Sequence, residues 1–307
     1  MATYTSRSFR KDPGLVMRMY FTMFMLGILY ALFALFLYTM TGIGMGLIAV
    51  IVGVMVAVQY FLSDKMILWS TGAKEVTEAQ EPELHRMVAR LAQRAGMPMP
   101  KVAVVQSSAP NAFATGRNPK NALVAVTTGI RQRLSERELE AVLGHELAHV
   151  RNRDMRVLAI ANFLVTMTSF LMTMLFWNML FGGMGRRRDS GAGGIMMVYL
   201  VTIVVYFVGQ LLVLALTRYR EHGADHSGAE ISGDPGALAS ALEKISGGMA
   251  RIPDEDLRKM QTANAFLIVP AALKSENLVH LFSTHPKVED RVRRLRDLER
   301  RMRMGMR

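Results

Sequence analysis

The fold of this chain is decided by the stretch His145-Glu146-Leu147-Ala148-His149. In a helix, residues four apart point the same way, so both histidines can contact one ion. Two imidazoles on one face can bind Zn²⁺, and Glu146 can reach a water in the open metal position and act as general base. The stretch therefore predicts the metal-binding helix of a metalloprotease.

The residues before the histidines predict the helix itself. Ser135 is a favourable N-cap, and Glu138 three residues later completes a capping box. Leu139, Val142 and Leu143 then follow at helical spacing. The competing interpretation is a helix in which these residue types share this spacing by chance. A third ligand elsewhere in the chain would favour the metal-binding interpretation.

The composition predicts a membrane protein. Of the 307 residues, 51% are hydrophobic, which is high for one soluble domain, and no cysteine is present. A metal site must therefore use His, Asp or Glu. The formal charge of +12 suits basic faces beside an anionic lipid bilayer, whereas no motif for nucleic-acid binding is present.

Charge-free stretches predict four membrane helices, near residues 19–40, 45–62, 158–181 and 195–216. The third and fourth form a hairpin, which returns the chain to one face and brings Arg151 and Arg218 to the same side. The basic N-terminus predicts a cytoplasmic start and hence a cytoplasmic catalytic domain.

The arginines between the third and fourth segments oppose this orientation. With a cytoplasmic catalytic face, Arg186, Arg187 and Arg188 would lie outside, against the positive-inside rule. Two alternatives stay open: the second hairpin does not fully cross the bilayer, or the rule is broken here.

A small sheet is predicted before the metal helix. A helix over 83–94 is followed by strands near 101–105, 111–116 and 122–127. An edge strand in this sheet could hold an extended peptide by backbone pairing, although a purely structural sheet explains the pattern equally well.

Acidic residues directly after the fourth segment supply the missing ligand. Glu221 is the natural third ligand, and Asp225, one turn later, can hydrogen-bond a ligand imidazole and fix its tautomer. His222 and His226 point away from Glu221 by about 100° or more and rank below it. The alternative is a solvated acidic helix face paired with arginines.

The C-terminal region is predicted to be helical and soluble. Pro235 opens a helix that Gly247-Gly248 should end near Ile245. A basic final helix begins near Lys287. Its apolar side consists of Val288, Val292 and Leu295.

The fold class predicted from these patterns is mainly α with a small β-sheet, combining transmembrane helices with a zincin-type catalytic domain. Four regions follow: an N-terminal transmembrane hairpin over 1–64, the sheet and zinc-motif helix over 65–156, a second transmembrane hairpin over 157–217, and the third ligand with the helical C-terminal region over 218–307.

Several motifs in order resemble the HtpX family of membrane zinc proteases, gluzincins related to the CAAX prenyl proteases. The shared features are the 145–149 motif before a hydrophobic hairpin, Arg220-Glu221-x-x-Ala224-Asp225, Ser283-Thr284-His285-Pro286, and the 111–116 segment. The resemblance covers most of the chain. It implies an endopeptidase in a bacterial or archaeal inner membrane that faces the cytoplasm and removes misfolded or damaged membrane proteins.

The resemblance also implies roles for single residues. One Zn²⁺ per chain would be bound by His145, His149 and Glu221, with Glu146 as the base. His285 would help stabilise the tetrahedral intermediate, although Pro286 equally suggests a simple helix start. The residues expected to lie along the substrate are Asn111, Ala112, Phe113 and Ala114.

Two rival functions belong beside this one. A CAAX-type processing protease would be expected to have seven spans, and this chain has four candidates. A non-catalytic membrane scaffold with structural zinc should offer four protein ligands, and only three are identified. A transporter is disfavoured because the candidate spans carry no acidic or basic residue in their interior.

Overall fold

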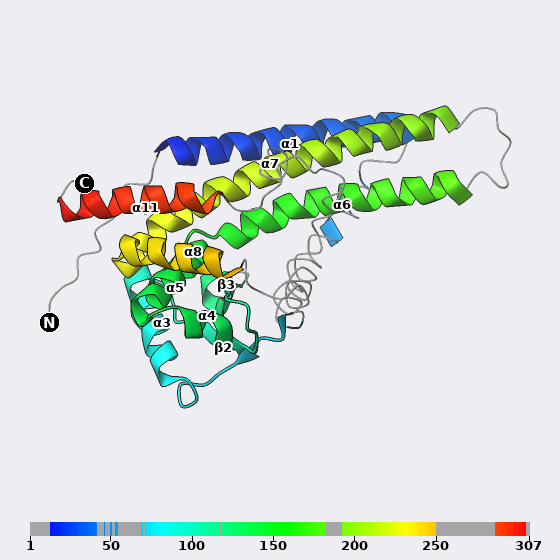
Figure 1. The fold of residues 1–307 in the computed structure, drawn as a ribbon. Helices are drawn as coiled ribbons and strands as arrows, with labels where there is room; N and C mark the ends of the chain where they lie inside the picture. The colour runs from blue at the N-terminus through cyan, green and yellow to red at the C-terminus, as the bar shows by residue number, and fades with distance from the viewer. Residues whose placement is uncertain are drawn as a thin grey trace.

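The computed structural model describes residues 13–41, 71–116, 118–181, 192–249 and 286–304, together with the single positions 46, 50, 53, 54 and 69. Three long helices extend away from a smaller domain of helices and a sheet (Figure 1). The second predicted membrane segment, 45–62, falls almost wholly outside the described residues, as do Arg186–Arg188 and His285.

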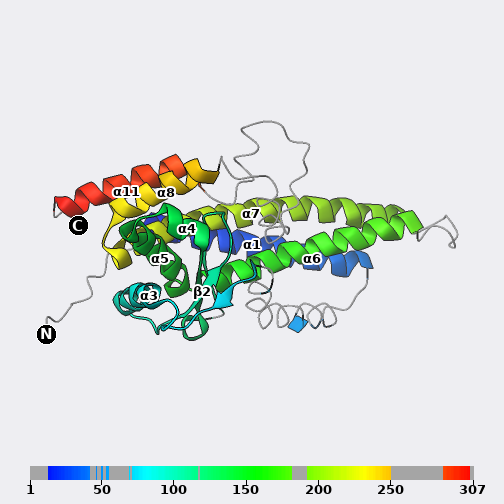
Figure 2. The same ribbon diagram turned by 60° about the horizontal axis from the view of Figure 1, so that its bottom comes forward.

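The long helices confirm three of the predicted apolar segments. They are α1 (Pro13–Thr41), α6 (Asp154–Phe181) and α7 (Ala192–Ser232). α7 contacts both of the others, and the three run side by side in two views (Figures 1 and 2). Each contains a segment long and apolar enough to cross a membrane, of 28, 25 and 40 residues respectively.

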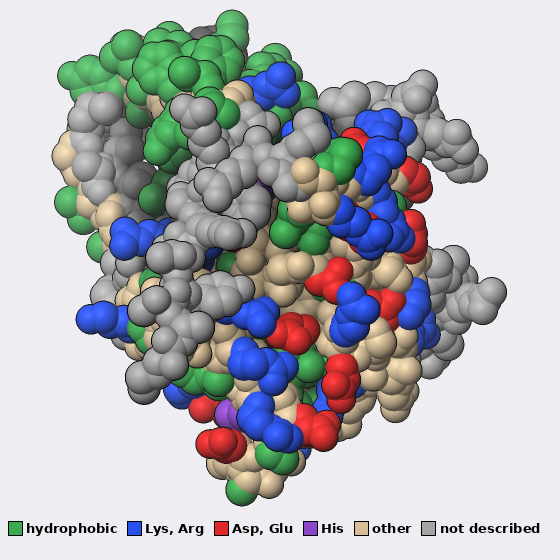
Figure 3. All heavy atoms as spheres, turned by 90° about the vertical axis from the view of Figure 1, so that its left-hand side faces the viewer, with side chains coloured by type: hydrophobic (Ala, Val, Ile, Leu, Met, Phe, Trp, Pro, Cys, Tyr) green, Lys and Arg blue, Asp and Glu red, His purple; other side chains and the backbone are tan. Residues whose placement is uncertain are grey.

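α7 is longer than a membrane requires. At about 1.5 Å per residue, the 40-residue helical stretch Gly193–Ser232 is roughly 60 Å long, against a hydrocarbon core of about 30 Å. Its second half therefore continues into the smaller domain of helices and a sheet, which is the polar domain of the protein. In the space-filling view, hydrophobic side chains gather in the upper part and charged ones over the lower and right-hand parts (Figure 3).

The sheet has four strands in the order β1-β2-β4-β3. The strands are β1 (Lys74–Glu75), β2 (Lys101–Val105), β3 (Ala112–Thr115) and β4 (Leu123–Thr127). β2 and β4 are parallel, whereas β3 pairs antiparallel with β4, with Phe113 opposite Ala125. Three strands were predicted; β1 was missed because two residues carry no alternating pattern. β3 is an edge strand.

In the described part of the chain, five α-helices accompany the sheet in the polar domain. They are α3 (Pro82–Ala95), α4 (Thr128–Arg133), α5 (Glu136–Arg151), α8 (Pro235–Met249) and α11 (Val288–Arg303). The capping box of Ser135 and Glu138 begins α5 as predicted. The prediction that α8 ends near Ile245 was wrong. A helical glycine costs only about 1 kcal/mol, which the packing of α8 against α5 and α11 offsets.

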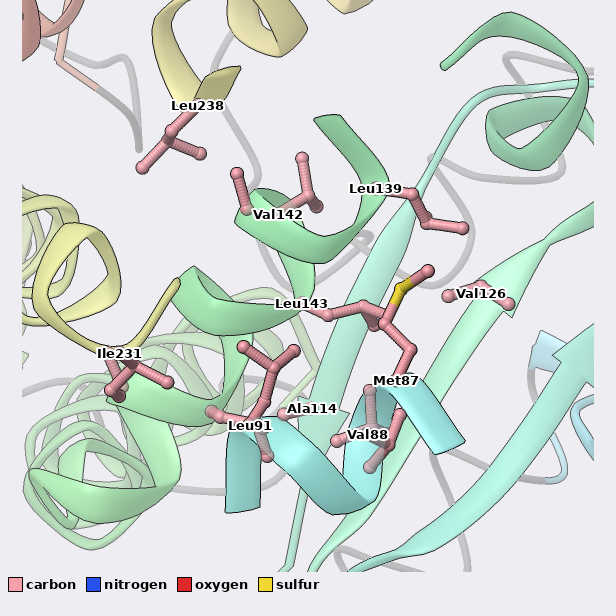
Figure 4. Close-up of a cluster of buried hydrophobic side chains, with 14 of the residues drawn as sticks. Met87, Val88, Leu91, Ala114, Val126, Leu139, Val142, Leu143, Ile231 and Leu238 are labelled. Carbon is pink, nitrogen blue, oxygen red and sulfur yellow. The ribbon is translucent and has the colours of Figure 1, made fainter. Parts of the chain in front are cut away.

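The core joins α3, α5, the sheet and the far end of α7 (Figure 4). Leu91 and Leu143 are completely buried, and Ile231 of α7 and Leu238 of α8 are 1% exposed. Burying such a side chain stabilises the fold by about 1.5–3 kcal/mol. This packing fixes the end of α7 against the helix that carries the histidines.

α5 and α7 cross closely at a glycine. A Cβ on Gly228 would lie 2.6 Å from the Cα of His145, and one on Gly144 would lie 3.1 Å from the carbonyl oxygen of Gly228. Only glycine at position 228 permits this backbone approach. Glu221, seven residues earlier on α7, is thereby brought opposite the histidines of α5.

Candidate metal centre and active site

Three side chains predicted as ligands meet between α5 and α7. Nε2 of His149 lies 3.4 Å from Oε1 of Glu221, and Nε2 of His145 lies 3.7 Å from Oε2. In a tetrahedral zinc site with bonds near 2.0–2.1 Å, neighbouring ligand atoms are about 3.4 Å apart. One ligand atom from each residue lies within 4.8 Å of the others, so the donor set fits such an ion.

A carboxylate lies beside the outer nitrogen of each ring. Nδ1 of His149 forms a hydrogen bond with Oδ2 of Asp154 at 2.8 Å, and a proton on this Nδ1 leaves the Nε2 lone pair to bind a metal. Nδ1 of His145 lies 3.1 Å from Oδ1 of Asp225 without a hydrogen bond among the described residues, and Nη2 of Arg291 lies 3.4 Å from its Nε2. Asp225 was predicted beside an imidazole. Asp154 was missed, although it is the first acidic residue after the second histidine.

Arg291 of α11 completes the buried charge cluster. Its Nε and Nη2 donate to Asp225 at 2.9 and 2.7 Å, and Nη1 lies 3.1 Å from Oε2 of Glu221. Burial on its own lowers the pKa of Arg291, but Asp225 and Glu221 outweigh it and raise the pKa. The sequence signal was an arginine inside the apolar stripe of the last helix, next to Val292.

The same carboxylates also change the pKa of His145. Burial on its own lowers its pKa, but the neighbouring carboxylates of Asp225 and Glu221 outweigh burial and raise the pKa. These carboxylates therefore favour positive charge between the donor atoms, whether it comes from a proton or from a metal ion.

Glu146 faces the edge strand. The backbone N–H of Ala114 donates to Oε2 of Glu146 at 3.1 Å, so the predicted base and the predicted substrate strand are neighbours. Asn111 lies just before β3, and its carbonyl accepts from the N–H of Thr127. Phe113 pairs with β4 inside the sheet.

The other predicted candidates do not join this cluster. Within the described ranges, the metal-binding group identified consists of His145, His149 and Glu221 alone. Nδ1 of His222 is buried and has no hydrogen-bond partner among the residues that the structure describes. His285 lies outside the described residues.

Comparisons with known proteins show the family to which the chain belongs. A family model described as peptidase family M48 matches residues 78–299. The chain belongs to peptidase family M48. It is 53% identical to "Protease HtpX homolog" of Moorella thermoacetica over 297 residues, 96% of this chain and 98% of that relative. It is 49% identical to "Protease HtpX homolog 2" of Methanosarcina mazei, over 96% and 99% of the two chains.

A similar fold is found in a distant solved structure. A crystal structure of S. mikatae Ste24p superposes with a TM-score of 0.55 at 18% identity, covering 88% of this chain and 62% of that one. The resemblance to HtpX proteases is confirmed, and this M48 chain is a membrane metalloprotease. Its substrates are therefore polypeptides, and its surroundings include a lipid bilayer.

Proposed function

We propose that the protein is a zinc-dependent endopeptidase of the cell membrane that cleaves misfolded or damaged membrane proteins at the cytoplasmic face. The observation that carries this proposal is the convergence of His145, His149 and Glu221 beside Glu146 and an edge strand. A purely structural zinc site would not need an acidic side chain such as Glu146 next to an edge strand.

The ion would be held by Nε2 of His145, Nε2 of His149 and the carboxylate of Glu221. When bound, zinc supplies Lewis acidity that polarises a peptide carbonyl and makes a water more acidic. The hydrogen bond with Asp154 keeps the imidazole of His149 in the tautomer with Nε2 available, and the carboxylate of Asp225 lies 3.1 Å from Nδ1 of His145.

Glu146 acts as the base in this proposal. Its carboxylate takes a proton from the attacking water and delivers it to the leaving amine, a role typically worth about 10²–10⁴ in rate. The N–H of Ala114 holds one oxygen of this carboxylate at 3.1 Å and leaves the other for the water. The backbone of β3 therefore orients the base.

The edge strand would bind the substrate backbone. In an antiparallel pair, alternate residues direct their N–H and C=O groups away from the partner strand. Ala114 directs its N–H to Glu146 rather than to β4, so Ala112, two residues earlier, faces the same side. An extended peptide can pair with Ala112 and with the carbonyl of Ala114 next to the base.

Membrane-protein substrates are favoured by the position of the site along α7. Arg218 is the first charged residue after the apolar run, and Glu221 follows three residues later. The catalytic group therefore lies close to the level at which a membrane-embedded substrate emerges into water.

Paired glutamine variants test the base. Glu146→Gln should keep its zinc, measured by mass spectrometry of the metal, but lose at least about 100-fold in cleavage of casein. Glu140→Gln is the control, since Glu140 lies on the same helix and its ion pairs, among the described residues, are with surface arginines. A Glu146→Gln enzyme with normal activity would refute this role, and metal without any peptidase activity in the native chain would favour the scaffold.

Cysteine labelling tests the orientation. The chain has no cysteine, so Glu136→Cys introduces a single thiol on an exposed position of α5. In intact spheroplasts, a membrane-impermeant maleimide should leave it unlabelled, and lysis should expose it. Labelling before lysis would move the catalytic domain to the outer face.

A further inference from the structure

A cavity of about 550 Å³ lies behind the candidate metal centre, between α1, α6, α7 and α11. Its described lining includes Asp154 and Asp225, which lie beside the two imidazoles, but neither Glu146 nor β3. The cavity is therefore separate from the proposed peptide strand. Its volume is that of a small-ligand site.

The walls of the cavity differ in chemistry. One wall is apolar and comes mainly from the start of α1, with Met19 and Met23, and from Val157 of α6. The other is polar and carries arginines of α7 and α11. Val157 begins the apolar run of α6, so the cavity lies where apolar helices meet the polar domain. A ligand with one apolar part and one charged part would match these two walls.

Buried nitrogens on the polar wall lack partners among the described residues. The Arg220 side chain is 2% exposed, and its Nη2 lies 3.1 Å from Asp154. Its Nε and Nη1 have no hydrogen-bond partner in the described part of the chain, nor has Nδ1 of His222. A buried guanidinium with two unused nitrogens is costly, so an acceptor that reached it from the cavity would stabilise it.

The acidic residues of the lining are already neutralised. Asp154 pairs with Arg220, Asp225 with Arg291, and Asp297 with Arg300. Two further arginines of the lining, Arg294 and Arg301, are exposed and form no ion pair within the ranges that the structure describes. The cavity therefore carries surplus positive charge at its rim.

We propose that this cavity binds the phosphate of an anionic phospholipid, with Arg220, Arg294 and Arg301 around the phosphate and the acyl chains along α1. Arginine is well suited to phosphate because its N–H groups match the phosphate oxygens. The bound headgroup would lie next to Asp154, which holds His149. The proposal does not depend on the peptidase function, because it rests on donors and charges outside that site.

Lipid titration of the purified, zinc-loaded full chain tests the proposal. Phosphatidylglycerol should raise the unfolding temperature and remain bound at one molecule per chain in native mass spectrometry, whereas phosphatidylcholine should not. The double variant Arg294→Gln, Arg301→Gln should bind phosphatidylglycerol roughly tenfold or more weakly. Both side chains are exposed, so the variant is expected to fold.

A matched double variant controls for general charge. Arg293→Gln with Arg303→Gln removes the same charge from the same helix, but these arginines pair with Asp290 and Glu299, outside the cavity lining. It should bind the lipid like the native chain. Equal weakening by both double variants, or equal binding of the two lipids, would overturn the proposal. Equal stabilisation by inorganic phosphate would overturn the assignment to a lipid.

Discussion

Gly228→Ala should separate the two halves of the metal centre. The new Cβ would lie 2.6 Å from the Cα of His145, whereas ordinary contacts begin near 3.4 Å, so the helices must part by about 0.8 Å. Because α7 is one rigid helix, Glu221 moves with it. Metal–ligand distances tolerate only about 0.2 Å, so zinc affinity should fall. The overpacking itself should cost about 1–3 kcal/mol.

The assay combines zinc retention in a competing chelator, kcat/KM on casein and the unfolding temperature. A displacement approaching 1 Å should lower kcat/KM by a factor on the order of 100. Gly223→Ala on the same helix is the control, because its Cβ meets only a methyl of Leu15 at an ordinary 3.7 Å. A Gly228→Ala protein with native zinc affinity and activity would refute the close-crossing argument.

Further outcomes are expected from single changes. Asp154→Asn should weaken zinc binding by roughly 10–100-fold in a chelator competition, since it holds Nδ1 of His149; unchanged affinity would contradict this. Ala112→Pro removes one outward N–H and should lower kcat/KM by roughly 2–12-fold without lowering the unfolding temperature; native kinetics would exclude pairing there. Incubation with a chelator should abolish cleavage and added zinc should restore it, whereas chelator-resistant activity would exclude a metal mechanism. Burial alone would raise the pKa of Glu138, but hydrogen bonds from Lys244 and the neighbouring serines lower it from 4.5 to about 2. Its stabilisation, at most about 3 kcal/mol, is complete above about pH 5 and is lost as the pH falls toward 2. Unfolding temperatures of Glu138→Gln should therefore fall less between pH 6 and pH 3, and parallel pH curves would contradict the shift.

Local signals explain what could be predicted from the sequence. The capping box at Ser135 and the apolar spacing after it were sufficient to predict α5, and a helical turn brings His145 and His149 to one side. Glu221 could be proposed because a membrane hairpin returns the chain to its starting face. These features depend on neighbours within a few residues or on membrane thickness.

The features missed depend on contacts between distant segments. Asp154 and Arg291 lie 137 residues apart (291 − 154), and nothing near either one shows that both belong to the metal centre. Arg291 did carry a signal, since a charge on an apolar helix face must have a buried partner. The crossing at Gly228 could not be foreseen, because a glycine within a helix has no local requirement to be there.

The single uninterrupted helix α7 has a consequence for biosynthesis. In the proposed ligand set, the ribosome makes His145 and His149 about 70 residues before the third ligand, the carboxylate of Glu221. That carboxylate meets them only once α7 has been made and has packed against α5. A nascent chain that ends before α7 would therefore lack the third ligand and the peptidase activity that depends on it.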